Sequence, residues 1–140
     1  MPKRTSNKRP AKTGGLGAMS PVAFAPTTNP PQSRAFYEGT LGLTCVSEDA
    51  LALVFDLHGV PLRVVNVVSV KGFQPAPFTI LGWEVPNIAA AVKDLASRGV
   101  EFERYPGMEQ DASGIWTSPS RARVAWFKDP EGNVLAVTQY

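Results

Sequence analysis

A chain of 140 residues, 44% hydrophobic and 19% charged, has the size and composition of one globular domain, which excludes a second catalytic domain. Its single cysteine, Cys45, excludes an internal disulfide and a thiolate zinc cluster. Its single histidine, His58, excludes metal sites of two or three histidines and histidine relays within one chain.

The net charge of +2 is unevenly distributed. Residues 1–19 carry five basic residues and no acid, so this tail is +5, whereas nine basic and twelve acidic residues make the remainder −3. Leu16 is the only large aliphatic residue of the tail, and we therefore expect the tail to be disordered. We interpret it as a solvated extension, or as a segment that precedes a true translation start at Met19.

A polybasic arm for nucleic acid or an anionic membrane is the alternative interpretation of the tail. No aromatic residue interleaves with its charges, and we expect neither nucleic acid nor a membrane as a partner. No apolar segment has the length of a secretory signal or a transmembrane helix, so the sequence predicts a cytoplasmic protein.

The sequence of the first module, residues 20–70, predicts a strand, a helix and three further strands. The helix begins with Asn29 as cap and Pro30 at its first position, and it ends near Gly39. His58 and Gly59 form a tight hairpin turn between two apolar segments. The predicted strands cover residues 21–26, 41–48, 51–57 and 61–68.

A linker at residues 70–77 leads to a second module, residues 78–140, with the same order of elements. Its helix follows Pro86 and Asn87 and carries one apolar face, formed by Ile88, Ala91, Val92 and Leu95. A turn at residues 129–133, with the sequence Asp-Pro-Glu-Gly-Asn, precedes the last strand. The predicted strands cover residues 78–85, 100–105, 115–117, 122–128 and 134–138.

Two of these segments resemble motifs of the vicinal oxygen chelate superfamily, which includes glyoxalase, bleomycin-resistance proteins and extradiol dioxygenases. Residues 34–43 resemble its "FY…LGL" segment and residues 129–133 its "DP(D/E)GN" turn, in the expected order. The resemblance covers about residues 21–139. It implies an α+β fold of two βαβββ modules that form an open, curled eight-stranded sheet around a cavity, with the helices outside.

Metalloenzymes of this superfamily bind a divalent ion through four side chains, usually His, Gln or Glu. The resemblance assigns these positions to Val22, Ile80, Ala136 and a residue at or beside Arg63. An alkyl side chain has no lone pair with which to coordinate a cation. We therefore expect a metal-free member, similar to the bleomycin-resistance branch, without a cofactor.

Alternation along the strands predicts which other side chains share the cavity with these positions. The resulting pocket is apolar with few polar groups, as small-molecule sites usually are. The predicted ligand-binding residues are Val22, Phe24, Arg63, Ile80, Tyr105, Trp116, Ala136 and Thr138.

Several of these residues have two interpretations. Arg63 either binds a carboxylate or phosphate of the ligand or turns outward toward an acid or water. Trp116 lies either at the pocket mouth or in an interface, and Tyr105 could donate a hydrogen bond to a ligand. Trp126 and Phe127 have opposite parity, so one faces the cavity and the other the core.

Other residues that could attract a functional assignment are expected to be structural. Trp83 has the opposite parity to Ile80 and is expected in the core. His58 is expected to be a structural residue of the hairpin turn, and Cys45 is expected to be a small buried residue.

The leading functional hypothesis is a non-catalytic binder of an aromatic or amphipathic compound. The second is a lyase, isomerase or epimerase that uses Glu84, Tyr105 and Arg63. The third is a dimeric protein-interaction module.

Overall fold

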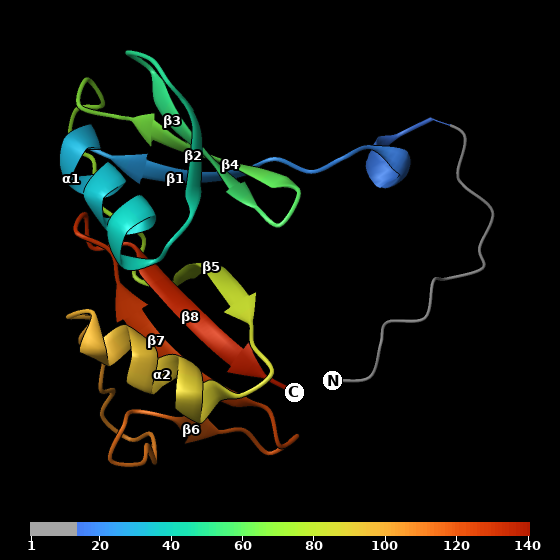
Figure 1. Ribbon diagram of the computed structural model, residues 1–140, viewed down its shortest axis with the longest axis vertical. Coiled ribbons are helices and arrows are strands. Elements are labelled where there is room, and N and C mark those ends of the chain that lie inside the picture. The colour runs from blue at the N-terminus through green and yellow to red at the C-terminus, as the bar shows by residue number, and fades with distance from the viewer. Residues whose placement is uncertain (1–13) are drawn as a thin grey trace.

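The computed structural model describes residues 14–140, and most of the predicted tail lies outside this range. The described part of the tail contains a short 3₁₀-helix, Leu16–Ala18, with no buried residue. This turn stands apart from both modules (Figure 1). No helix within residues 14–140 is long and apolar enough to span a membrane.

The first module contains the predicted strand, helix and three strands. The Asn29 side chain accepts a 3.2 Å hydrogen bond from the Gln32 amide, which confirms the helix cap that the sequence predicts. The helix continues as a π-helix beyond Arg34, an irregularity that is not predicted from the sequence. The elements are β1 (Ala23–Thr27), α1 (Pro30–Arg34), the π-helix (Ala35–Thr40), β2 (Thr44–Glu48), β3 (Ala52–Leu57) and β4 (Val60–Asn66).

The second module repeats this order. Asn87 caps its helix by accepting a 3.0 Å hydrogen bond from the Ala90 amide, and Ile88 and Val92 of the predicted apolar face are buried. The elements are β5 (Thr79–Glu84), α2 (Ile88–Ser97), β6 (Trp116–Thr117), β7 (Arg123–Lys128) and β8 (Val134–Gln139).

The prediction of a strand over residues 100–105 is wrong. Only Phe102 pairs there, in an isolated bridge to Phe127, and the Glu103 amide donates to the Trp126 carbonyl. The chain then turns, with the Met108 amide donating to the Tyr105 carbonyl, so pairing cannot continue along β7.

The fold class predicted from the sequence is confirmed, and the eight strands of the structure form two sheets of four. Their orders are β1-β4-β3-β2 and β5-β8-β7-β6, so each module arranges its strands in the same way. In each sheet the first strand runs parallel to the last strand of its module and the other pairs are antiparallel. Figure 1 shows the two sheets one above the other.

One hydrophobic core joins the two modules. The first sheet contributes side chains such as Phe55 and Leu62, and the second contributes Phe127 and Leu135. Helix residues that belong to the same core include Tyr37, whose ring lies 5.6 Å from that of Phe55. Since each sheet directs one face toward this shared core, its other face is directed away from the core.

The turn at residues 129–133 also connects the modules through polar contacts. The Glu131 carboxylate accepts hydrogen bonds from the amide and hydroxyl of Thr28. Asn133 Nδ2 donates a 2.9 Å hydrogen bond to the Pro26 carbonyl. The turn therefore connects the last hairpin of the second module to the end of β1.

Candidate functional site

On the first sheet, one row of side chains crosses the face opposite the core. Phe24 of β1 and Val54 of β3 are both register partners of Arg63 of β4. Phe24 is 60% exposed, and Val22, which precedes β1, is 46% exposed. Val54 is not among the residues predicted from the sequence, although the two-residue turn at His58 and Gly59 fixes this register.

Arg63 supplies a positive charge to this face. It is half-buried, and the four ion pairs within the described residues do not include it. The pKa of Asp49 is lowered, mainly because its carboxylate accepts backbone hydrogen bonds from Leu51 and Ala52. The charge of Arg63 lowers this pKa further. The guanidinium is thus a donor group that no carboxylate of the described chain neutralises by direct contact.

On the second sheet, the face opposite the core carries three clustered aromatic rings. Trp126 lies between the other two, with ring centroids 5.5 Å from Tyr105 and 5.9 Å from Trp116. Phe127 is fully buried in the core, so Trp126 is the member of this pair that faces away from it. Burial raises the pKa of Tyr105, and the charge of Glu103 raises it further. We call Tyr105, Trp116 and Trp126 the aromatic cluster.

Small residues adjoin the aromatic cluster. Ala136 is the register partner of both Trp126 and Gly82, and Thr138 pairs with Glu84 in the next row. A Cβ on Gly82 would lie 3.1 Å from the Ala136 carbonyl oxygen, so the strand spacing here suits glycine. Gly82 is exposed and has no side chain, so the backbone of β5 is accessible on this face. β8 lies between Gly82 and the strand that carries Trp126.

The residues that the resemblance assigns to the superfamily's metal positions do not fit a divalent cation. Val22 and Ala136 offer only alkyl groups, and the guanidinium of Arg63 is itself a cation. Ile80 lies at a register shift between Thr79 and Leu81 and packs against the core. Within residues 14–140, no three His, Cys, Asp or Glu side chains gather in a way that could hold a metal.

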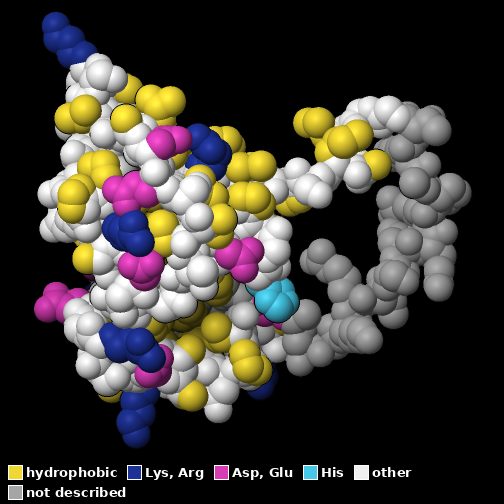
Figure 2. All heavy atoms as spheres, turned by 45° about the horizontal axis from the view of Figure 1, so that its top comes forward, with side chains coloured by type: hydrophobic (Ala, Val, Ile, Leu, Met, Phe, Trp, Pro, Cys, Tyr) yellow, Lys and Arg dark blue, Asp and Glu magenta, His cyan; other side chains and the backbone are white. Residues whose placement is uncertain are grey.

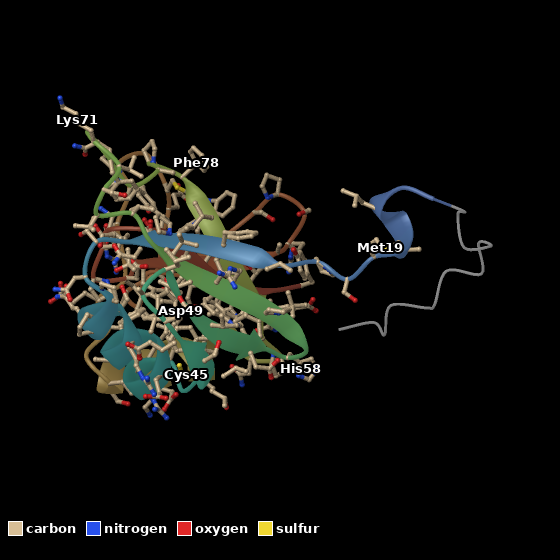
Figure 3. The ribbon with its side chains drawn as sticks, turned by 90° about the horizontal axis from the view of Figure 1, so that it is seen from above. Met19, Cys45, Asp49, His58, Lys71 and Phe78 are labelled. Atoms are coloured by element: carbon tan, nitrogen blue, oxygen red, sulfur yellow. The ribbon has the colours of Figure 1, made fainter. Side chains whose placement is uncertain are left out.

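Three further residues lie away from both faces or in the core. His58 is exposed, has a φ of 51° and lies at the tip of the β3–β4 hairpin (Figure 3). Cys45 is half-buried, and Cys45 and Trp83 both pack against the core. The turn role of His58 and the core packing of Trp83 agree with the sequence analysis.

The structure divides the predicted ligand-binding residues between the two sheets. Arg63 and Phe24 lie on the first, whereas Trp116, Ala136 and Thr138 lie on the second. Tyr105 lies in the loop after α2, and its ring contacts Trp126 of the second sheet. Of the residues named in the catalytic hypothesis, Glu84 lies on β5 and Tyr105 contacts β7 of the second sheet, whereas Arg63 lies on β4 of the first. Among the described residues, no ion pair joins Arg63 to Glu84, and no hydrogen bond joins it to Tyr105.

Comparison with known proteins agrees with this architecture. The family model of the Glyoxalase/Bleomycin resistance protein/Dioxygenase superfamily matches residues 20–137. The chain belongs to this superfamily. Comparison with functionally curated proteins gives no significant match.

Solved structures with the same fold come from several bacteria. A superfamily member from Sphaerobacter thermophilus is 20% identical with a TM-score of 0.67, covering 87% of this chain and 98% of its own. A glyoxalase/bleomycin resistance protein/dioxygenase from Alicyclobacillus acidocaldarius is 15% identical with a TM-score of 0.63, covering 88% and 92%. A lactoylglutathione lyase from Agrobacterium tumefaciens is 15% identical with a TM-score of 0.62, covering 87% and 92%. At these identities the likeness extends to the fold alone.

Proposed function

We propose that this chain is a metal-independent binding protein for a small aromatic carboxylate. The observation that carries the proposal is the chemistry at the superfamily's metal positions, where Val22, Ile80 and Ala136 supply no ligand atom. A cavity that has lost its chelating groups retains apolar surface for binding, and the aromatic cluster adds stacking surface.

Arg63 supplies the polar contact that the metal would otherwise provide. Its planar guanidinium can donate two parallel hydrogen bonds to one carboxylate, which fixes both the position and the plane of the ligand. Phe24, adjacent in register, offers an apolar surface to the remainder of the molecule. A phosphate satisfies the same donors, but its charge is less suited to the apolar surroundings.

A second copy of the chain completes the cavity in this proposal. Arg63 and the aromatic cluster lie on faces directed away from a common core, so one copy contacts a ligand from one side only. In a two-fold dimer the same pair of surfaces meets twice, and the first sheet of one copy can face the second sheet of the other. The exposure of Phe24 and Val22 on this face supports such an association.

Calorimetric titration with 2-naphthoate tests the proposed site. We expect saturable binding that weakens at least about tenfold in Arg63→Gln, because a charged hydrogen bond contributes about 1.5–3 kcal/mol. Trp126→Ala should weaken binding similarly through lost stacking. Lys71→Gln, which removes an exposed positive charge elsewhere, is the matched control and should bind normally. Equal affinity for Arg63→Gln and Lys71→Gln would contradict the assignment.

Sedimentation over a concentration series tests the dimer. We expect a dimer at the concentrations where 2-naphthoate binds. A chain that is monomeric by sedimentation and still binds 2-naphthoate with the affinity measured by calorimetry would exclude the shared cavity.

A further inference from the structure

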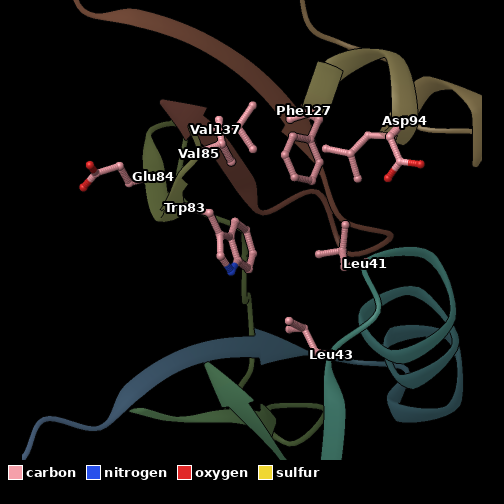
Figure 4. Close-up of a pocket in the computed structure, with 10 residues that line it drawn as sticks. Leu41, Leu43, Trp83, Glu84, Val85, Asp94, Phe127 and Val137 are labelled. Carbon is pink, nitrogen blue, oxygen red and sulfur yellow. The ribbon is translucent and has the colours of Figure 1, made fainter. Parts of the chain in front are cut away.

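A pocket lies between the two modules, on the core side of the second sheet. Its volume is about 290 Å³. Leu41 and Leu43 line it from the first module, and Trp83, Leu95, Phe127 and Val137 line it from the second. Figure 4 shows these side chains around a common space, and Figure 2 shows hydrophobic side chains in a recess between the modules. We call it the inter-module pocket.

The inter-module pocket is separate from the site proposed above. Phe127 and Val137 line it, whereas their chain neighbours Trp126 and Ala136 lie on the opposite face of the same sheet. The sheet itself therefore stands between the two sites. A molecule in this pocket touches neither Arg63 nor the aromatic cluster.

The chemistry of the lining favours an uncharged ligand. Two carboxylates border the pocket, those of Glu84 and Asp94, and no cationic side chain lines it. The Glu84 carboxylate is directed away from the Trp83 ring (Figure 4), and Asp94 accepts a 3.1 Å hydrogen bond from Arg98. An anion in this lining would lose its hydration without gaining a cationic partner, so anionic molecules are disfavoured.

The volume sets the size of the occupant. A dry apolar cavity of roughly 150 Å³ accommodates benzene, so this pocket has room for two fused rings. Trp83 and Phe127 provide aromatic surfaces against which such rings can pack. We propose that the inter-module pocket is a second binding site, specific for a small uncharged two-ring aromatic compound. Because both modules line the pocket, the compound also connects the modules.

Fluorine NMR of the full chain carrying 5-fluorotryptophan tests this proposal, with 2-naphthol as the uncharged probe and 2-naphthoate as its anionic counterpart. The chain has three tryptophans, so three resonances can be assigned with single Trp→Phe variants. We expect 2-naphthol to shift the Trp83 resonance saturably. We expect 2-naphthoate to shift the Trp116 and Trp126 resonances instead.

A filling variant and a matched control complete the test. Ala91→Leu places extra side-chain volume in the pocket and should weaken 2-naphthol binding at least about tenfold. Ala90→Leu makes the same change at an exposed neighbouring position outside the lining and should bind normally. Leu43→Phe is the second filling variant should Ala91→Leu fail to fold.

Three results would overturn the proposal. One is a Trp83 resonance that 2-naphthol leaves unmoved, and another is a shift that both filling variants retain. The third is a Trp83 resonance that moves with protein concentration alone, since a second copy would then cover the pocket. The titrations of Trp83 and of the aromatic cluster are read separately, so either site can fail without the other.

Discussion

The Tyr37 hydroxyl donates a 2.6 Å hydrogen bond to Oδ2 of Asp129, and both residues are buried. The bond joins the helical segment of the first module to the last turn of the second. Asp129 also accepts hydrogen bonds from the Glu131 and Asn133 amides and from Asn133 Nδ2. This carboxylate is therefore the centre of the polar contact between the modules.

Tyr37→Phe should lower the free energy of unfolding by about 1–3 kcal/mol, because it leaves a buried carboxylate with one donor fewer. The aromatic ring and its contacts with Phe36 and Phe55 are retained in this variant. Urea unfolding measures the difference. Tyr140→Phe removes a hydroxyl from a residue that is 71% exposed and should be neutral. Equal stabilities of the two variants would show that the bond contributes nothing.

Stability should also fall at alkaline pH through Tyr37. Burial, together with the charge of Asp129, raises the pKa of Tyr37 above its ordinary value. The unfolded chain therefore loses this proton first, and the stabilisation is complete below about pH 10 and declines as pH rises beyond it. Wild type should lose up to about 1.4 kcal/mol per pH unit more than Tyr37→Phe above pH 10. Parallel slopes for the two proteins in urea unfolding between pH 8 and 11 would contradict this origin.

Gly132 should tolerate no side chain. Its φ is 96°, and an added Cβ would lie 3.3 Å from Cγ of Pro75. Gly132→Ala should therefore destabilise the protein by about 1–2 kcal/mol. Gly39 is the matched control, since no atom lies within 4 Å of an added Cβ and its φ is ordinary. Thermal unfolding in which Gly39→Ala loses as much as Gly132→Ala would show that neither the φ nor the Pro75 contact matters.

Local signals account for the parts of the fold that the sequence predicts correctly. The caps at Asn29 and Asn87 and the turn around Gly132 are determined by adjacent residues, so they can be recognised without knowledge of the tertiary structure. The repeated order of elements adds the two-module architecture. The π-helix after Arg34 has no such local signal.

Strand parity predicts the candidate site only in part. Trp126 and Phe127 differ in parity, but alternation alone does not say which of them faces the core. At Ile80 the register shift breaks the alternation, so Ile80 and Trp83 both pack against the core despite their opposite expected parity. The division of the site between two sheets depends on how the modules pack, which the period of a single strand does not encode.

Calorimetric titration of 2-naphthoate into protein treated with EDTA and then dialysed free of chelator tests whether binding needs a metal. We expect saturable binding with the same affinity before and after addition of Zn²⁺, Ni²⁺, Fe²⁺ or Mn²⁺. Binding that is absent after EDTA treatment and returns with one of these ions would contradict a metal-independent site.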